Sequence, residues 1–116
     1  GMDAGDRLTL VEERVGRRLV IRVVGDLDYA GAPKLAEAVL SAIADGTDRC
    51  ALDLSRVEYI DSEALRTLVL LRRELQQKDK TLEALDCSEQ VARILKLVDF
   101  DGLLDWLKGP EPGVRS

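Results

Sequence analysis

The stretch LDLSRVEYIDSEAL, residues 52–65, decides the fold of this chain. It continues a short run, Cys50 to Leu54, that is apolar except for Asp53. Such a run is typical of a strand that is covered on both faces. The apolar pattern then stops for several residues and resumes at Leu65. We therefore expect a buried strand, a short crossing turn and the start of a long helix.

Apolar residues recur at helical spacing beyond this turn. With about 100° per residue they share one side of a helix; they are Ala64, Leu65, Leu68, Val69, Leu71 and Leu75. The spacing predicts a helix from near Ser62 to about Lys78. Arg72 falls inside the apolar side, where it can bury its stem and extend its charge. Leu70 falls outside it, so either the helix is covered over a wider arc or Leu70 is an exposed anchor for a partner.

Ser62 lies where the turn becomes the helix. Serine is a preferred N-cap residue, because its hydroxyl accepts a hydrogen bond from a free N–H of the first turn. Asp61 and Glu63 place negative charge at the positive end of the helix dipole. Taken alone, these residues need no function beyond starting a helix.

The N-terminal half predicts a hairpin. Residues 8–12 and 19–24 are both strand-like, and Gly16-Arg17-Arg18 suits the turn between them. The second run is nearly all apolar, so we place it inside the sheet. Gly25 is expected to end this strand.

A helix follows the second strand. Asp26 and Asp28 suit a loop and a helix N-terminus. For Asp28, capping is favoured; for Asp26, capping is one of two roles that remain equally open. Pro33 fits the first helical position, and Gly46 ends the helix. The order of elements from Val20 to Leu54 is a βαβ unit, which implies parallel pairing and a right-handed crossover.

The C-terminal part predicts one more strand and a helix. Residues 78–80 form a turn, and residues 81–85 form a strand of modest strength. Ser88 can cap the helix that follows. Trp106 and Leu107 are expected to pack a last short turn.

Composition sets limits on the function. The chain has 116 residues, enough for one domain with a core, and only 3% of them are aromatic. The core must therefore consist of Leu, Val, Ile and Ala.

The net charge of −5 argues against a nucleic-acid or anionic-membrane surface. No apolar run approaches the roughly 20 residues that span a bilayer, and we expect no secretory leader, because the N-terminal residues lack a basic segment followed by an apolar one. We expect a cytoplasmic protein without membrane insertion.

The cysteines and the ends of the chain lead to further expectations. Cys50 and Cys87 are expected to be reduced and buried as small apolar groups. Because the chain has no histidine, a zinc site is improbable. Gly1 before Met2 looks like the scar of a cleaved tag. We expect a flexible lead at residues 1–7, one domain at residues 8–108 and a flexible tail at residues 109–116.

Asp61-Ser62 followed by Ala64-Leu65 resembles the switch motif of the STAS domain family, the anti-sigma factor antagonists. The usual form of that motif is Asp-Ser-Ser/Thr/Ala-Gly-Leu/Ile/Val, and the preceding Leu-Asp-Leu-Ser-x-Val-x-x-Ile also fits. Gly25-Asp26-Leu27-Asp28 resembles a second signature, Gly-Glu/Asp-Leu/Ile-Asp, and residues 91–104 resemble the family's last helix and its ending. The resemblance covers about Leu8 to Leu107.

The resemblance implies the fold and the function. The fold would be α/β, a single STAS-like domain in which a mixed sheet of four to five strands is packed with about four helices. The domain would bind an anti-sigma factor, a serine kinase of the ATP-binding histidine-kinase-like type, and free a sigma factor. Phosphorylation of Ser62 would release the kinase, and a PP2C-type phosphatase would reverse the modification. The implied partner-binding residues are Asp26, Asp28, Asp61, Ser62, Glu63, Ala64 and Leu65.

An enzymatic function is not expected, and no cofactor is implied. The chain has no histidine for a catalytic triad, and Gly25 to Asp28 lacks the glycine spacing of a phosphate loop. Carboxylates are plentiful, but no pattern marks two of them as a catalytic pair.

Two residues depart from the family motif. Ala64 replaces the usual glycine; it is harmless in a first helical turn but adds a methyl group where a partner approaches. Glu63 replaces a small residue and places a permanent charge beside the acceptor hydroxyl. The alternative function is therefore a STAS docking subunit that is never phosphorylated, within a stress-sensing complex or a lipid or ABC-type transport complex.

Overall fold

The structure, a computed structural model, describes residues 7–98 and 102–108. Its single sheet has four strands in the order β1-β2-β3-β4. Strand β1 pairs with β2 antiparallel, whereas β2–β3 and β3–β4 are parallel. The strands are β1 (Leu8–Val15), β2 (Arg18–Leu27), β3 (Arg49–Ile60) and β4 (Thr81–Cys87). The predicted mixed sheet and the hairpin turn after Val15 are confirmed.

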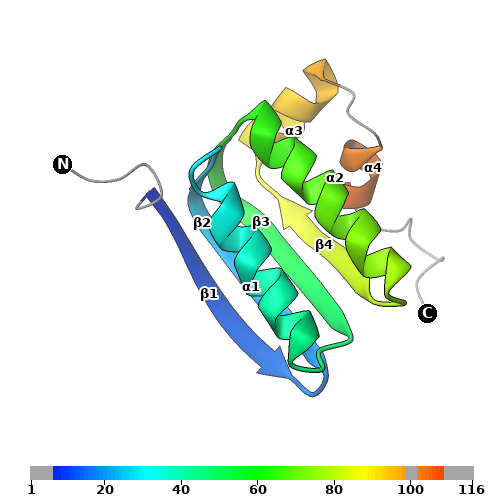
Figure 1. Cartoon of the computed structure of the whole chain (residues 1–116). Helices are drawn as coiled ribbons and strands as arrows, with labels where there is room; N and C mark the ends of the chain where they lie inside the picture. Colours follow the sequence, from blue (N-terminus) through cyan, green and yellow to red (C-terminus); the bar gives the residue numbers. More distant parts are fainter. Residues whose placement is uncertain (1–6, 99–101, 109–116) are drawn as a thin grey trace.

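Four helices pack against this sheet, as expected. They are α1 (Ala32–Ala44), α2 (Ser62–Gln77), α3 (Glu89–Leu97) and α4 (Leu103–Lys108). Helices α1 and α2 lie side by side across one face of the sheet, and α3 and α4 lie on the β4 side (Figure 1). The chain is therefore an α/β domain, and the two parallel crossovers place α1 and α2 on the same face.

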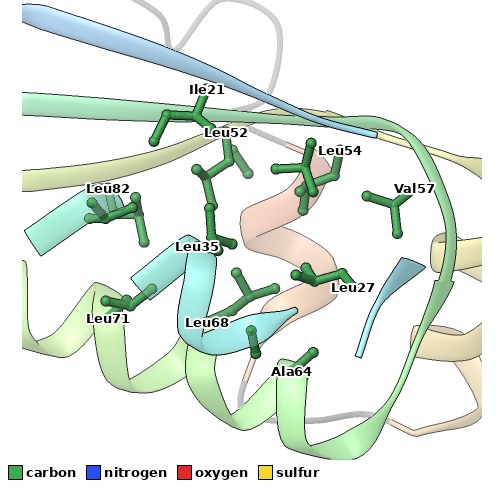
Figure 2. Packing of buried hydrophobic residues seen from close by; sticks show 14 of the residues in the cluster. Ile21, Leu27, Leu35, Leu52, Leu54, Val57, Ala64, Leu68, Leu71 and Leu82 are labelled. Atoms are coloured by element: carbon green, nitrogen blue, oxygen red, sulfur yellow. The ribbon is translucent and has the colours of Figure 1, made fainter. Parts of the chain in front are cut away.

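The core lies between α1, α2 and the sheet. Leu52 and Leu54 of β3 point toward Leu35 of α1 and Leu68 of α2, and all four side chains are fully buried (Figure 2). The core cluster is made of aliphatic side chains and Cys50, with Trp106 packed against it. This agrees with the low aromatic content, since Leu, Val, Ile and Ala fill the interior.

Strands β2 and β3 are longer than the sequence predicts. The expected turn after Leu54 is wrong, because β3 continues to Ile60, and Gly25 does not end β2, which continues to Leu27. Asp26 pairs with Tyr59, and Leu27 pairs with Ile60. Register shifts between Arg22 and Val24 and between Gly25 and Asp26 interrupt the pairing. These irregularities break the period-two alternation that reveals a strand in a sequence.

Gly25 makes the close approach of β1 possible. Its φ is +105°, and a Cβ atom at this position would collide with the carbonyl oxygen of Arg7. Gly31 is also confined, because a Cβ atom there would lie 3.0 Å from Leu8 Cδ2. At Gly25, only glycine fits the backbone without displacing the start of β1; at Gly31, where φ is −85°, a small shift of the Leu8 side chain would relieve most of the crowding.

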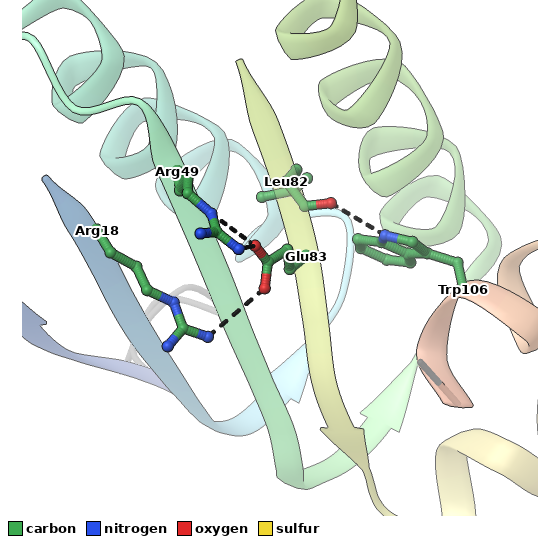
Figure 3. A network of polar contacts seen from close by, with 5 residues as sticks. All are labelled: Arg18, Arg49, Leu82, Glu83 and Trp106. Carbon is green, nitrogen blue, oxygen red and sulfur yellow. Dashed lines mark hydrogen bonds and ion pairs between the residues drawn. The ribbon is translucent and has the colours of Figure 1, made fainter. Parts of the chain in front are cut away.

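The other face of the sheet has charged side chains. Arg49 donates from Nε to Glu83 Oε1 at 3.0 Å, and Arg18 Nη2 lies 3.5 Å from Glu83 Oε2 (Figure 3). Arg22 pairs with Asp53 at 3.5 Å. Burial alone would raise the pKa of Asp53, but hydrogen bonds from Ser55 and the ion pair with Arg22 hold that pKa below its usual value. These partly exposed pairs each add little stability.

Helix α4 is attached to the edge of the sheet through Trp106. The indole Nε1 donates to the carbonyl oxygen of Leu82 at 3.0 Å (Figure 3). The Arg72 guanidinium lies 5.5 Å from the centroid of the indole ring, a cation–π distance. Arg72 is partly buried, as expected of a residue that buries its stem and extends its charge.

Some local expectations need correction. Leu70 is half exposed, so a wider apolar arc does not cover it. Cys50 is buried, and burial raises the pKa of its thiol, but Cys87 is only partly buried because it ends the edge strand β4. Ser88 does cap α3, with Val91 N–H donating to Ser88 Oγ at 3.2 Å.

Several predicted segments lie outside the described residues. They are the lead before Arg7, the tail at residues 109–116 and residues 99–101 of the predicted last helix. No helix within the described ranges is both long enough and apolar enough to cross a membrane.

Candidate functional site

Asp61, not Ser62, is the N-cap of α2. The Asp61 backbone is extended, with φ −108° and ψ 176°, and its Oδ1 accepts the Ala64 N–H at 2.8 Å. Ser62 is the first residue of the helix, and its side chain is exposed. The interpretation of Ser62 as a capping residue is therefore wrong, and its hydroxyl is not needed to start the helix.

The same carboxylate also binds the loop before α1. Asp61 Oδ2 accepts the backbone N–H of Tyr29 at 2.7 Å. The backbone N–H of Asp61 in turn donates to the carbonyl oxygen of Leu27 at 3.4 Å. Because β2 and β3 are parallel neighbours, their carboxyl ends meet at one edge of the sheet, and Asp61 joins the segments that follow them.

The buried side chain of Asp28 binds the backbone of the loop before α1. Its side chain is only 5% exposed, and its Oδ1 accepts the N–H groups of Ala30 at 3.1 Å and Gly31 at 2.9 Å. Its carbonyl oxygen accepts the Ala32 N–H at 2.7 Å. The N-cap of α1 is Gly31, without a side-chain hydrogen bond. Asp28 therefore orders the loop rather than capping α1 as predicted.

The seven predicted site residues divide into an exposed and a buried group. Asp26, Asp61, Ser62 and Glu63 reach solvent, and we call these four the switch face. Asp28, Ala64 and Leu65 are buried, Ala64 and Leu65 to 1% and 2% exposure. The structure brings all seven into neighbouring segments, but only the switch face offers side chains to a partner. Contact with a partner stays a prediction for each of them.

The two departures from the motif differ in their structural effect. The Ala64 methyl group points into the core, among Leu27 and Leu68 (Figure 2), so it does not stand where a partner approaches. Glu63 is exposed in the first turn of α2, and its carbonyl oxygen accepts a hydrogen bond from Thr67 Oγ1 at 3.0 Å. Only Glu63 changes the chemistry of the exposed surface.

Two exposed tyrosines were missed by the sequence interpretation. Tyr29 follows Asp28 and is 67% exposed, and Tyr59 precedes Ile60 and is 50% exposed. Tyr59 pairs with Asp26 in the sheet, so both tyrosines lie in the segments that build the switch face. The sequence did contain a signal for them. The chain has only two tyrosines, and both lie within two residues of a motif residue.

Comparison with known proteins identifies the family. The family model described as "Mlab, STAS domain" matches residues 10–105. The chain is 31% identical over 91 residues to an anti-sigma-B factor antagonist of Staphylococcus epidermidis, covering 78% of this chain and 84% of that protein. The anti-sigma-B factor antagonist of Staphylococcus aureus has the same identity and coverage.

Solved structures show the same fold. The unphosphorylated form of the anti-sigma factor antagonist SpoIIAA matches with a TM-score of 0.70 and 25% identity over 84% of each chain. An anti-sigma factor antagonist from Mycobacterium paratuberculosis matches with a TM-score of 0.70 and 26% identity, over 88% of this chain and 86% of that one. The chain belongs to the STAS domain family, and these relatives and structures are anti-sigma factor antagonists.

Proposed function

We propose that this chain is an anti-sigma factor antagonist, a non-enzymatic protein that binds an anti-sigma factor through the switch face and is controlled by phosphorylation of Ser62. In its unmodified form it binds the anti-sigma factor, a serine kinase with an ATP-binding, histidine-kinase-like domain. Phosphorylation releases the kinase, and a phosphatase of the PP2C type reverses the modification. The relatives support the antagonist role, and the exposed Ser62 supports the switch.

The observation that supports the switch most directly is that Asp61, and not Ser62, caps helix α2. Asp61 provides the helix cap, so the Ser62 hydroxyl has no structural duty that a modification would disrupt. It is exposed at the first position of a sixteen-residue helix. A kinase can therefore reach Ser62 without unfolding any part of α2.

The chemical step is a phosphoryl transfer. The bond between Ser62 Oγ and the γ-phosphorus of ATP forms as the β–γ phosphoanhydride bond breaks. ADP leaves, and the hydroxyl loses its proton to a base or to water. The product has about −1.5 to −2 additional charges at pH 7. Free N–H groups and the helix dipole at the start of α2 allow the domain itself to tolerate that charge.

A partner surface tolerates the same charge much less well. A surface that fits a neutral hydroxyl has no room for a phosphate, and Asp26, Asp61 and Glu63 add negative charge around it. A loss of only about 3 kcal/mol at the interface weakens binding roughly a hundredfold. The fold survives phosphorylation while the complex dissociates.

The test uses the whole chain as bait in lysate of its source organism. Wild type, Ser62→Ala and Ser62→Asp are compared, and the captured proteins are identified by mass spectrometry. We expect wild type and Ser62→Ala to retain a kinase-type anti-sigma factor and Ser62→Asp to lose it. The purified partner with ATP should then add one phosphate to wild type and none to Ser62→Ala.

The exposed Glu63 next to Ser62 supports a second candidate function, a docking subunit. This charge favours a docking subunit that is never phosphorylated, and the family model is described by the name Mlab. Equal capture of one partner, such as a transport ATPase, by all three baits would support docking and contradict the switch. Glu63→Ala separates the two functions further, because it should speed phosphorylation only if a kinase acts on Ser62.

A further inference from the structure

We propose that Tyr29 and Tyr59 are the aromatic anchors of the partner interface and that Asp61 acts as a positioning residue by holding Tyr29 in its loop. The partner is a protein whose contact surface presents basic groups. This inference rests on the proposed function for the identity of the partner. Neither tyrosine belongs to the motif residues, so the assignment depends on the geometry of this chain.

The exposure of the two side chains is the first argument. Tyr29 is 67% exposed and Tyr59 is 50% exposed, whereas Trp106 is packed against the core. Tyrosine is enriched among the residues that dominate binding energy, which distinguishes these two side chains from the exposed aliphatic ones. Tyr59 pairs with Asp26 in the sheet, and the Tyr29 N–H donates to Asp61, so both tyrosines flank residues of the switch face.

The position of Tyr29 is set by Asp61. The Tyr29 N–H donates to Asp61 Oδ2 at 2.7 Å, and the buried Asp28 fixes the next two backbone N–H groups of the loop. A loop with a fixed backbone presents its side chain at a small entropic cost, which favours binding. Asp61 therefore affects binding through Tyr29 in addition to its own charge.

The charge of the same segments indicates the partner's chemistry. Residues 25–31 and 59–65 contain Asp26, Asp28, Asp61 and Glu63 and no Lys or Arg; the nearest basic residues along the chain are Arg22, Lys34, Arg56 and Arg66. Three of these carboxylates reach solvent; Asp26 pairs with Tyr59, and Asp61 accepts the Tyr29 N–H. A surface with arginine side chains complements this arrangement, because guanidinium groups pair with carboxylates and stack on aromatic rings.

Photo-crosslinking tests the anchors and captures the partner in the same step. The amino acid p-benzoylphenylalanine is placed in the full chain at Tyr29, at Tyr59 or, as a control, at Leu97, which is 83% exposed on α3. After irradiation in cells of the source organism, we expect positions 29 and 59 to form an adduct with one and the same protein and position 97 to form none with it. Absence of that shared adduct overturns the proposal.

The strength of each contact is then measured with the crosslinked protein in purified form. Tyr29→Ala and Tyr59→Ala should each raise the Kd at least about tenfold, whereas Leu97→Ala should leave it unchanged. The affinity should also fall as salt rises, because the complementary charges are screened. Tyrosine variants that bind as tightly as wild type would overturn the assignment.

Asp61→Asn tests the positioning role. Asparagine can still cap α2 through its carbonyl oxygen, but its amide group offers an N–H where Tyr29 needs an acceptor. We expect faster hydrogen exchange at the Tyr29 amide, and a smaller effect of Tyr29→Ala on Kd in the Asp61→Asn background than in wild type. Additive effects in this double-mutant cycle, or unchanged exchange, would contradict the role of Asp61.

The outcomes separate this inference from the proposed function. If the crosslinked protein is not an anti-sigma factor, the proposed function fails while the anchors stand. If an anti-sigma factor is captured and Ser62→Asp releases it, but the tyrosine variants bind normally, the function stands and the anchors are wrong.

Discussion

The Asp61 carboxylate lies between two backbone segments that are far apart in the sequence: Oδ2 is 2.7 Å from the Tyr29 amide nitrogen, and Oδ1 is 2.8 Å from the Ala64 amide nitrogen. One side chain thus caps α2 and orders the loop before α1. Its neighbour Ser62 has neither duty, so structural and regulatory roles are divided between adjacent residues.

The first prediction follows from this division. Asp61→Ala removes the cap and leaves the Tyr29 N–H without its acceptor, so we expect a loss of about 1–3 kcal/mol in the free energy of unfolding. Ser62→Ala should change it by less than about 0.5 kcal/mol. Urea unfolding followed by circular dichroism measures both variants. A larger loss for Ser62→Ala than for Asp61→Ala would show that the serine is the cap after all.

The second prediction concerns Gly25. Gly25→Ala places a methyl group against the carbonyl oxygen of Arg7 at a φ that disfavours alanine. Gly46→Ala is the matched control, because Gly46 also has a positive φ, +96°, but open space around it. We expect Gly25→Ala to be less stable than Gly46→Ala by at least about 2 kcal/mol. Equal melting temperatures for the two variants would contradict the collision.

The third prediction concerns the attachment of α4. Trp106→Phe removes the donor to the Leu82 carbonyl oxygen and much of the stacking with Arg72, so the free energy of unfolding should fall by about 1–2 kcal/mol. Tyr59→Phe removes a hydroxyl from an exposed ring and should have almost no effect. Chemical unfolding monitored by far-ultraviolet circular dichroism compares them, since it does not depend on the indole signal. No difference between the two variants would mean that α4 adds nothing to stability.

The fourth prediction concerns pH. The pKa of Asp53 is lower in the folded state than its ordinary value of 3.8. Its stabilising contribution is therefore fully present above the unfolded-state pKa and is lost as pH falls through the folded-state pKa. Asp53→Asn should be less stable than wild type at neutral pH, and the difference should shrink at acid pH below 3.8. Measuring stability against pH, with Glu37→Gln as an exposed control, checks this; a constant difference would contradict it.

The helices were predictable because their signals are local. The predicted end of α2 at Lys78 is one residue beyond the observed Gln77, and the Ser88 cap of α3 was identified correctly. The ends of β2 and β3 were not predictable, because register shifts interrupt the strand periodicity, two in the β2–β3 pairing near Gly25 and one in the β3–β4 pairing near Asp53. Strand ends that depend on a neighbouring strand leave little trace in the sequence itself.

The sequence predicted which residues form the motif, but it predicted only some of their structural roles. Two residues with good capping chemistry, Asp61 and Ser62, stand side by side, and only the backbone conformation decides which one is the cap. The contact between Asp61 and Tyr29 joins residues 32 positions apart, so no local pattern reports it. The burial of Ala64 likewise depends on the direction in which α2 presents its first turn.

The unequal lengths of the strands have a consequence for evolution and for protein engineering. Strand β4 pairs with β3 only as far as Leu54, whereas β2 accompanies β3 to Ile60. The switch face thus lies at the end of β2 and β3, where these two strands extend beyond the four-stranded part of the sheet. Substitutions at Tyr29, Tyr59 and Glu63 alter exposed side chains there and leave the aliphatic core intact. One scaffold can therefore acquire a new partner through a few changes without losing its ability to fold.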